Sequence, residues 1–273
     1  MEKISEYLKI RIEDLEKNPT PRVAICLCLD VSGSMLSVES GEYIKTGKTI
    51  TIDGITAAVV TGGKTRLDEL QEGINSFYDE IGKDEIAQFA AEICVVTFGD
   101  EANCMLDFAN IYRQEVPNLR AAGRTSMGEG VNLALDLLER RKQEFKNAGV
   151  DYYQPWLVLM TDGEPNGDSS ELKRAMTRTV QMIGDKKLTL FPMGIGKDAN
   201  LETLALFTPR RNSIRLKEAK FKDFFEWLSS SVEKISQSTP GEQVALNLKA
   251  MSDWGEKYSL NTGKLEPMPA ELP

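Results

Sequence analysis

The sequence predicts an α/β fold: a doubly wound, mostly parallel central sheet with helices on both faces and one antiparallel edge strand. Four short, nearly continuous apolar runs are typical of strands that are buried on both faces. Amphipathic segments with a period of about 3.6 residues lie between or after these runs. Because strand and helix alternate along the chain, the strands should be parallel and joined by right-handed crossovers.

The elements follow in order along the chain. Residues 2–17 form a charged helical pattern that ends at Asn18-Pro19. The predicted strands are 23–29, 93–98, 156–160 and 188–191. Apolar residues at helical spacing predict helices around 67–81, 131–138, 172–183 and 221–235, the last having the clearest stripe.

Three segments stand outside this alternation and set the predicted domain organisation. An N-terminal helix occupies 1–19, and one domain covers 20–236. Within it, residues 38–64 are rich in β-branched residues and glycine, which predicts a hairpin insertion that turns at Thr46-Gly47. Prolines and the absence of sustained periodicity predict a tail over 237–273, although its apolar residues offer a way to dock: Val244, Leu248, Met251 and Trp254.

Composition and charge exclude several classes of function. The chain has 273 residues and a net charge of −9, with no run of five or more Lys or Arg residues, so a nucleic-acid partner is not expected. No apolar run approaches the roughly 20 residues of a membrane span. The acidic N-terminus does not resemble a signal peptide, so a cytoplasmic location is expected.

The absence of histidine and the spacing of the cysteines limit the chemistry further. The chain contains no histidine, which removes the commonest general base and metal ligand. Its four cysteines include no C-x-x-C pair, so a zinc site is not expected. Cys26 and Cys28 alternate with leucines in an apolar run and are interpreted as small buried hydrophobes.

Polar residues follow the predicted strands in three loops. Asp30-Val31-Ser32-Gly33-Ser34 comes directly after the first strand, and Thr161-Asp162-Gly163-Glu164-Pro165 follows the third. A second loop, 123–128, opens a helix, where Ser126 and Glu129 are predicted to form a capping box that leaves Thr125 free. Since ligands bind at the carboxyl ends of strands in such sheets, the three loops should converge on one edge.

This set of motifs resembles the von Willebrand factor A domain over residues 20–236. In that family a metal ion-dependent adhesion site is written D-x-S-x-S on the first loop, Thr on the second and Asp on the third. The matching residues are Asp30, Ser32, Ser34, Thr125 and Asp162. The resemblance implies that the three hydroxyls bind the ion and that the two carboxylates act directly or through water. It assigns no role to Glu164.

Within that family the sequence is most similar to small bacterial cytosolic members of the TerY-like, tellurium-resistance kind. The strings that carry this similarity are Asp30-Val31-Ser32-Gly33-Ser34-Met35, Arg66-Leu67-Asp68-Glu69-Leu70-Gln71-Glu72-Gly73-Ile74 and Thr161-Asp162-Gly163-Glu164-Pro165. The resemblance implies partners in bacterial stress-response or signalling assemblies, such as kinases, phosphatases or ATPases. The insertion at 38–64 departs from the family pattern beside the first metal loop.

The residue types agree with what the resemblance implies. Hydroxyls and two carboxylates suit Mg²⁺, or Mn²⁺ or Ca²⁺, better than Zn²⁺. An ion held by few protein oxygens keeps an exchangeable position that an Asp or Glu of a partner protein can fill. The expected function is therefore metal-dependent protein binding without catalysis.

Two other functions compete with this one. Residues 58–65, Ala-Val-Val-Thr-Gly-Gly-Lys-Thr, fit the phosphate-binding loop of a nucleotide hydrolase except for the leading Ala. The simpler interpretation of the same residues is a glycine turn with Thr65 as a helix N-cap. A second alternative function is that of a structural subunit whose metal site is vestigial. A purely structural interpretation of the motif is that Asp30 and Asp162 cap helices and bind no metal.

Overall fold

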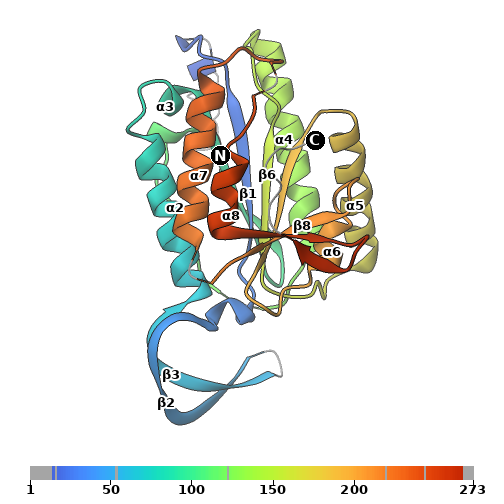
Figure 1. Ribbon diagram of the computed structural model, residues 1–273. Coiled ribbons are helices and arrows are strands. Elements are labelled where there is room, and N and C mark those ends of the chain that lie inside the picture. Colours follow the sequence, from blue (N-terminus) through green and yellow to red (C-terminus); the bar gives the residue numbers. More distant parts are fainter. Residues whose placement is uncertain are drawn as a thin grey trace, which may run out of the picture.

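The computed structural model describes residues 14–15, 17–52, 55–121, 123–218, 220–242 and 244–266. An eight-stranded sheet forms the centre of the molecule, in the order β10-β9-β8-β7-β6-β1-β4-β5 (Figure 1). The parallel strands are β1 (Val23–Asp30), β4 (Ala91–Phe98), β6 (Trp156–Thr161), β7 (Thr189–Ile195) and β8 (Asn212–Leu216). Four of these five confirm strands predicted from the apolar runs.

Antiparallel strands lie at both edges of the sheet, where the sequence predicted only one. β5 (Ala102–Asn110) pairs with β4 at one edge. At the other edge β9 (Gly255–Ser259) pairs with β8, and β10 (Lys264–Glu266) pairs with β9. The sequence did not reveal β5 and β8 to β10, because none of these four strands is a continuous run of buried apolar residues.

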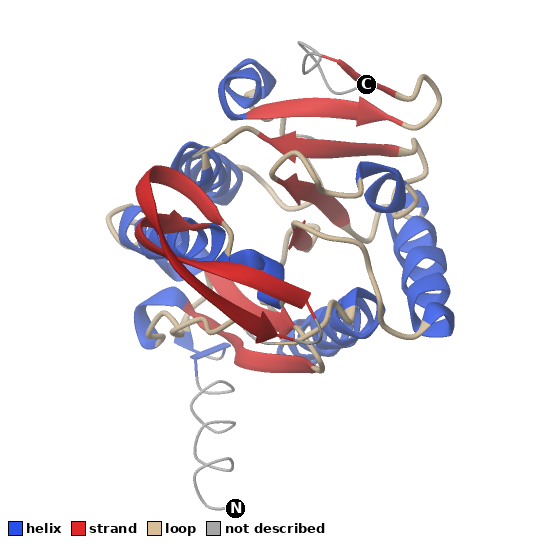
Figure 2. Ribbon diagram, turned by 90° about the horizontal axis from the view of Figure 1, so that it is seen from below, coloured by secondary structure: helices blue, strands red, loops and turns tan. Residues whose placement is uncertain are grey.

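Helices cover both faces of the sheet, as predicted (Figure 2). One layer contains α2 (Arg66–Ile81), α3 (Ala87–Ala90), α7 (Phe221–Ser236) and α8 (Leu248–Trp254). The other contains α4 (Met127–Ala148), α5 (Ser169–Gly184) and α6 (Leu201–Ala205). Side chains of β1 alternate between the two layers: Val23, Ile25, Leu27 and Leu29 pack in the first, and Ala24, Cys26 and Cys28 in the second.

The predicted insertion forms a two-stranded ribbon that extends from one end of the body (Figure 1). Its strands are β2 (Val38–Ile52) and β3 (Ile55–Thr65), which pair antiparallel. The predicted turn at Thr46-Gly47 is wrong, since the chain turns between Ile52 and Ile55. Gly47 lies instead where the register shifts between Lys45 and Thr49, with a φ of 74° that glycine adopts without strain.

The phosphate-loop interpretation of residues 58–65 is also contradicted. These residues form most of β3, an extended strand of the ribbon, and do not wrap around a helix N-terminus. Thr65 is the N-cap of α2, and it forms a capping box with Asp68. Lys64 Nζ lies 2.6 Å from Glu72 Oε2 at the surface. Of the simpler interpretation, the N-cap at Thr65 is confirmed, whereas the predicted glycine turn is wrong because Gly62 and Gly63 lie within β3.

The predicted C-terminal tail folds onto the domain as far as residue 266. Its apolar residues dock: Met251 and Trp254 of α8 are 3% and 1% exposed, and the backbone N–H of Lys217 donates to the carbonyl of Trp254 at 2.9 Å. β9 and β10 then extend the sheet. At the other end, most of the predicted helix at 2–17 lies outside the described residues, and Asp14 and Leu15 are helical and buried.

None of the helices in the described ranges is both long enough and apolar enough to cross a membrane.

Candidate metal centre

The three polar loops meet at the carboxyl ends of the central strands. β1 lies between β4 and β6 in the sheet. The chain first adds β4 next to one edge of β1 and later adds β6 next to the other edge, so the direction in which strands are added reverses at β1. This reversal creates the crevice in which ligands bind in doubly wound folds. Asp30 ends β1, and Asp162 comes directly after β6. The predicted convergence of the loops is confirmed.

Asp30 is held by hydrogen bonds at the carboxyl end of β1. Its side chain is fully buried, with the residue 0% exposed. The backbone N–H of Ser32 donates to its Oδ1 at 2.7 Å, and the hydroxyl of Thr161 donates to its Oδ2 at 2.5 Å. Both carboxylate oxygens are therefore fixed by neighbouring strands and the loop that follows β1.

A chain of hydroxyls connects the first loop to the third. Ser32 Oγ lies 2.9 Å from Ser34 Oγ, and the hydroxyl of Ser34 donates to Asp162 Oδ1 at 2.6 Å. Ser34 belongs to a short 3₁₀ helix, η1 (Gly33–Leu36), which turns the chain directly after β1. Hydrogen bonds thus connect four of the five predicted residues in one chain: Asp30, Ser32, Ser34 and Asp162.

The second loop brings Thr125 to the same place. A Cβ built on Gly163 would lie 3.8 Å from Ser34 Oγ and 3.9 Å from Thr125 Oγ1, so both hydroxyls border one point. The loop is anchored by Gly123, whose φ is 78° and whose carbonyl accepts from the N–H of Gly33 at 3.1 Å. The positive φ of Gly123 favours glycine there, and a Cβ at this position would also displace the exposed carboxylate of Asp100.

The predicted capping box at the start of α4 is wrong. Ser126 is the N-cap of α4, but its hydroxyl donates to the carbonyl of Asp100 at 3.0 Å and makes no cap bond. Glu129 instead turns toward the third loop, where its Oε1 accepts from the N–H of Asp168 at 3.4 Å. The prediction failed because tertiary contacts between loops compete with local capping.

The ionised form of Asp30 is unfavourable in this site, because the carboxylate is buried and close to the charge of Asp162. Burial, followed by the nearby charge of Asp162, raises the pKa of Asp30 to about 6, although hydrogen bonds from Ser32 and Thr161 act in the opposite direction. A divalent cation would remove this repulsion. The donor set, two carboxylates and three hydroxyls without nitrogen or sulfur, fits a hard ion such as Mg²⁺.

The raised pKa predicts how the stability of the metal-free protein depends on pH. In the unfolded chain the pKa of an Asp is about 3.9, so between that value and about 6 the folded state binds more protons at Asp30. Stability attributable to Asp30 should therefore increase as the pH falls from about 7 to about 5. To check this, the melting temperatures of the wild type and of Asp30→Asn are measured in chelator at several pH values, and the value for the variant is subtracted from that of the wild type. This difference should rise on acidification, and a constant difference would contradict the prediction.

Sequence reasoning missed one charged residue at the site. Arg66 Nη1 donates to Asp162 Oδ2 at 2.7 Å, and Arg66 Nε donates to Glu39 Oε2 at 3.0 Å. Burial lowers the pKa of Arg66, but its bonds to Asp162 and Glu39 more than offset this effect and the pKa is raised. No local pattern indicated these contacts, because the partners are 96 and 27 positions away in the sequence.

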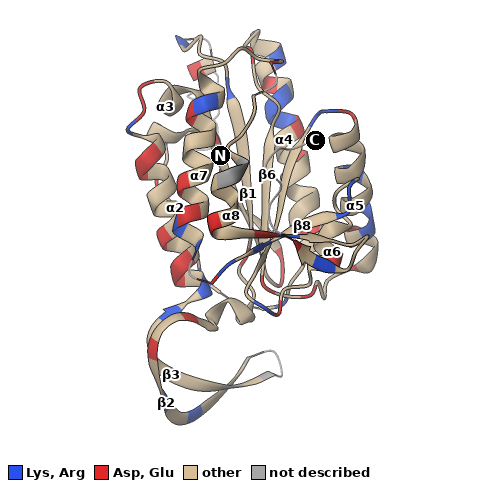
Figure 3. Ribbon diagram, viewed as in Figure 1, with Lys and Arg blue, Asp and Glu red and all other residues tan. Residues whose placement is uncertain are grey.

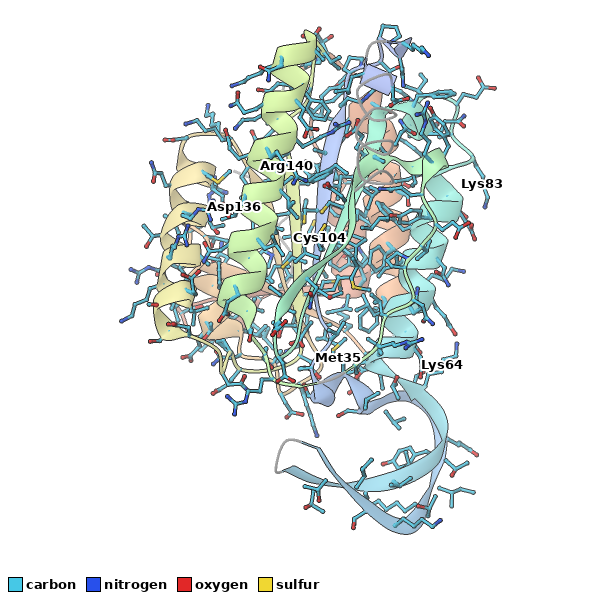
Figure 4. The ribbon with its side chains drawn as sticks, turned by 180° about the vertical axis from the view of Figure 1, so that it is seen from behind. Met35, Lys64, Lys83, Cys104, Asp136 and Arg140 are labelled. Atoms are coloured by element: carbon cyan, nitrogen blue, oxygen red, sulfur yellow. The ribbon has the colours of Figure 1, made fainter. Side chains whose placement is uncertain are left out.

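A second group of metal-ligand types lies away from this crevice. Ligand atoms of Cys94, Cys104 and Asp107 are within 4.8 Å of one another. Arg140 already donates to both oxygens of Asp107 at 2.6 and 2.7 Å, and Figure 4 shows Cys104 and Arg140 on neighbouring elements. Burial raises the pKa of Cys94, which favours the neutral thiol over the thiolate that a metal needs. The crevice is the better candidate.

Two of the cysteines, Cys26 and Cys28, agree with the sequence analysis. Cys26 and Cys28 are buried in the layer beneath α4, which confirms their interpretation as small core residues. Cys104 differs, because it lies exposed on the edge strand β5.

Comparisons with known proteins identify the fold family. The family profile of the von Willebrand factor type A domain matches residues 25–227. No curated protein sequence matches the chain. Among solved structures, the pilus adhesin SpaC from Lactobacillus rhamnosus GG has a TM-score of 0.54 and 13% identity over 79% of this chain and 31% of its own. At that identity the likeness concerns the fold.

Two further solved structures are similar over most of this chain. The von Willebrand factor type A protein from Catenulispora acidiphila has a TM-score of 0.46 and 17% identity over 83% of this chain and 44% of its own. BatB from Bacteroides thetaiotaomicron has a TM-score of 0.47 and 16% identity over 79% of this chain and 100% of its own. This chain covers 62%, 48% and 44% of the length of three of the solved chains that it matches.

Proposed function

Because the chain belongs to the von Willebrand factor type A domain family, we propose that it is a non-catalytic module that binds an acidic side chain of a partner protein through a bound Mg²⁺ ion. Domains of this family are protein-interaction modules and commonly bind a divalent metal. The residues proposed to hold the ion are Asp30, Ser32, Ser34, Thr125 and Asp162.

The convergence of five oxygen-bearing side chains from three loops carries this proposal. Asp30, Ser32, Thr125 and Asp162 are each at most 4% exposed, yet they lie at the end of the sheet, where the loops open to the surface. A core would bury apolar residues at these positions, since two carboxylates at short range are unfavourable there. A structural subunit with a vestigial site gives no reason to retain this arrangement.

The chemistry of the site indicates how a partner would be recognised. Two carboxylates match but do not exceed the charge of a divalent cation, and five protein oxygens would leave one position of an octahedral shell open to a further oxygen ligand. A carboxylate of a partner supplies that ligand with the strongest electrostatic attraction. Recognition would then depend on metal occupancy and would require no bond to be made or broken in the partner.

The surroundings of the site offer further contact area for a partner. A cleft of about 690 Å³ begins at Val31 and Asp100 and continues to Met105 and Leu119. The ribbon of β2 and β3 leaves the body beside η1 and carries few charged residues (Figure 3). Tyr43, Ile44 and Ile50 on it are 49%, 75% and 50% exposed, so both faces of the ribbon offer apolar contact area to a partner.

The resemblance to TerY-like proteins extends this proposal to a cellular setting. We place the chain in the bacterial cytoplasm, in a stress-response or signalling complex, with a kinase, phosphatase or ATPase as the class of partner. Manganese or calcium would occupy the same oxygens if magnesium were scarce.

A capture experiment with and without chelator tests the function. The tagged protein in Mg²⁺ should retain partners from native lysate that are lost when chelator is added. Asp30→Asn should lose the same partners in Mg²⁺, and a peptide of the captured partner should lose binding when its critical Asp or Glu is replaced by Asn or Gln. Capture of the same proteins with and without chelator would contradict metal-mediated recognition.

A further inference from the structure

Arg66 lies where the ribbon joins the proposed metal site. It is the first residue of α2 and follows directly after the last residue of β3. Its guanidinium binds the Oδ2 of Asp162 at 2.7 Å, whereas the hydroxyl of Ser34 binds the Oδ1 at 2.6 Å. The two oxygens of Asp162 therefore serve different partners: one faces the hydroxyl cluster and the other faces Arg66.

Glu39 ties the opposite strand of the ribbon to the same guanidinium. It is the second residue of β2, and its Oε2 accepts from Arg66 Nε at 3.0 Å. The side chains of Arg66 and Glu39 are only 11% and 5% exposed, so this pair is poorly screened by water. The backbone N–H of Arg66 also donates to the carbonyl of Ser37 at 3.0 Å. Both strands of the ribbon are thus fixed to the site at one residue.

The guanidinium is confined on its remaining side by the loop after β7. A Cβ on Gly196 would lie 2.5 Å from Arg66 Nη2, and the φ of Gly196 is 75°, so a glycine there gives the guanidinium its space. The carboxylate of Asp198 lies 4.0 Å from the same nitrogen. Segments far apart in the sequence, the ribbon, β6 and β7, therefore enclose one positive charge.

We propose that Arg66 is a positioning residue that limits the Mg²⁺ affinity of the site and links that affinity to the position of the ribbon through Glu39. The proposal rests on the proposed metal-binding function. In the absence of metal, Arg66 compensates the charge of Asp162. A divalent cation held by the residues of the site would be repelled by the fixed guanidinium of Arg66, and the carboxylate of Glu39 would weaken that repulsion. A partner that displaces the ribbon would separate Glu39 from Arg66 and so change metal affinity.

Calorimetric Mg²⁺ titrations of charge variants test this role. Arg66→Met should bind Mg²⁺ about tenfold more tightly than the wild type, which corresponds to 1.4 kcal/mol, and its metal-free form should melt at a lower temperature. Glu39→Gln should have the opposite effect and weaken Mg²⁺ binding severalfold. Arg66→Lys keeps the charge and should remain within about threefold of the wild type. A merely structural Arg66 would lower the melting temperature in Arg66→Met without tightening Mg²⁺ binding.

The matched control is Lys83→Met, which removes a surface cation at the opposite end of α2 from Lys64 and the ribbon (Figure 4). It should leave the Mg²⁺ affinity unchanged. If Arg66→Met binds Mg²⁺ no more tightly than the wild type, or Glu39→Gln does not weaken binding, the role of Arg66 is refuted while the metal function stands. If Arg66→Met does not fold, Glu39→Gln alone decides. Failure of the wild type to bind Mg²⁺ would refute both.

Hydrogen exchange supplies a second readout of the link to the ribbon. Addition of Mg²⁺ to the wild type should change amide exchange at the base of the ribbon, around Val38–Ser40. The change should be smaller in Glu39→Gln, because the amide oxygen can still accept from Arg66 but no longer carries the charge that couples the ribbon to the guanidinium. Equal responses in both proteins would contradict the coupling.

Discussion

Replacing Asp30 by asparagine should abolish Mg²⁺ binding and leave the metal-free protein at least as stable as the wild type. Asparagine has the same shape and can still accept the bond from the N–H of Ser32, now made at 2.7 Å. It removes a charge that is fully buried and repelled by Asp162, so the metal-free fold should gain stability. It also removes one of the two carboxylates proposed to balance the ion, so affinity should fall at least about 100-fold.

Two measurements on Asp30→Asn check the expected loss of Mg²⁺ binding and the expected retention of stability. Calorimetry should show no Mg²⁺ binding by Asp30→Asn, and urea unfolding in chelator should show no loss of stability. The matched control is Asp136→Asn on α4, which removes a side chain that is 59% exposed and pairs with Arg178 at the surface. It should bind Mg²⁺ as the wild type does. An Asp30→Asn protein that retains Mg²⁺ affinity would remove Asp30 from the site.

Replacing Glu92 by glutamine should destabilise the protein by about 3–5 kcal/mol. Glu92 lies in β4 with a fully buried carboxylate between two guanidiniums that are 0% and 1% exposed. Its Oε1 accepts from Arg22 Nε at 3.2 Å and Arg141 Nη2 at 2.8 Å, and its Oε2 accepts from Arg141 Nε at 2.6 Å. A neutral amide would leave two buried cations without this charge, and its NH₂ group would face donors.

Urea denaturation of Glu92→Gln measures this cost, at constant pH and in chelator so that the metal site does not contribute. Glu144→Gln is the control, because Glu144 pairs with the same Arg141 at 2.5 Å but is 29% exposed. It should lose at most about 1 kcal/mol, because its carboxylate remains in contact with water and Arg141 keeps its pairing with Glu92. Similar losses in the two variants would show that Glu92 behaves as a surface partner of Arg141 and not as the centre of a buried network.

The strands and helices that were predicted correctly share one property. β1, β4 and β6 are buried along their whole length, and α2 and α7 bury one stripe against the sheet, so the environment imposes a period on the sequence. β5 and β10 form the two edges of the sheet, and β5, β9 and β10 all carry side chains that are at least partly exposed, so the requirement is weaker. Likewise, the ribbon was predicted from composition, but its turn depended on which residues absorb the bulge at Gly47.

The sequence by itself determined the core architecture and the five residues of the candidate site. Both are encoded locally: by apolar runs in the strands, and by short polar motifs placed where those strands end. Only the tertiary structure decided what surrounds the site. The contacts of Arg66 with Glu39 and Asp162, the bond from Ser126 to Asp100 and the docking of Trp254 join residues that are distant in the chain. Charge pairing and packing depend on which surfaces folding brings together, and no local spacing records that.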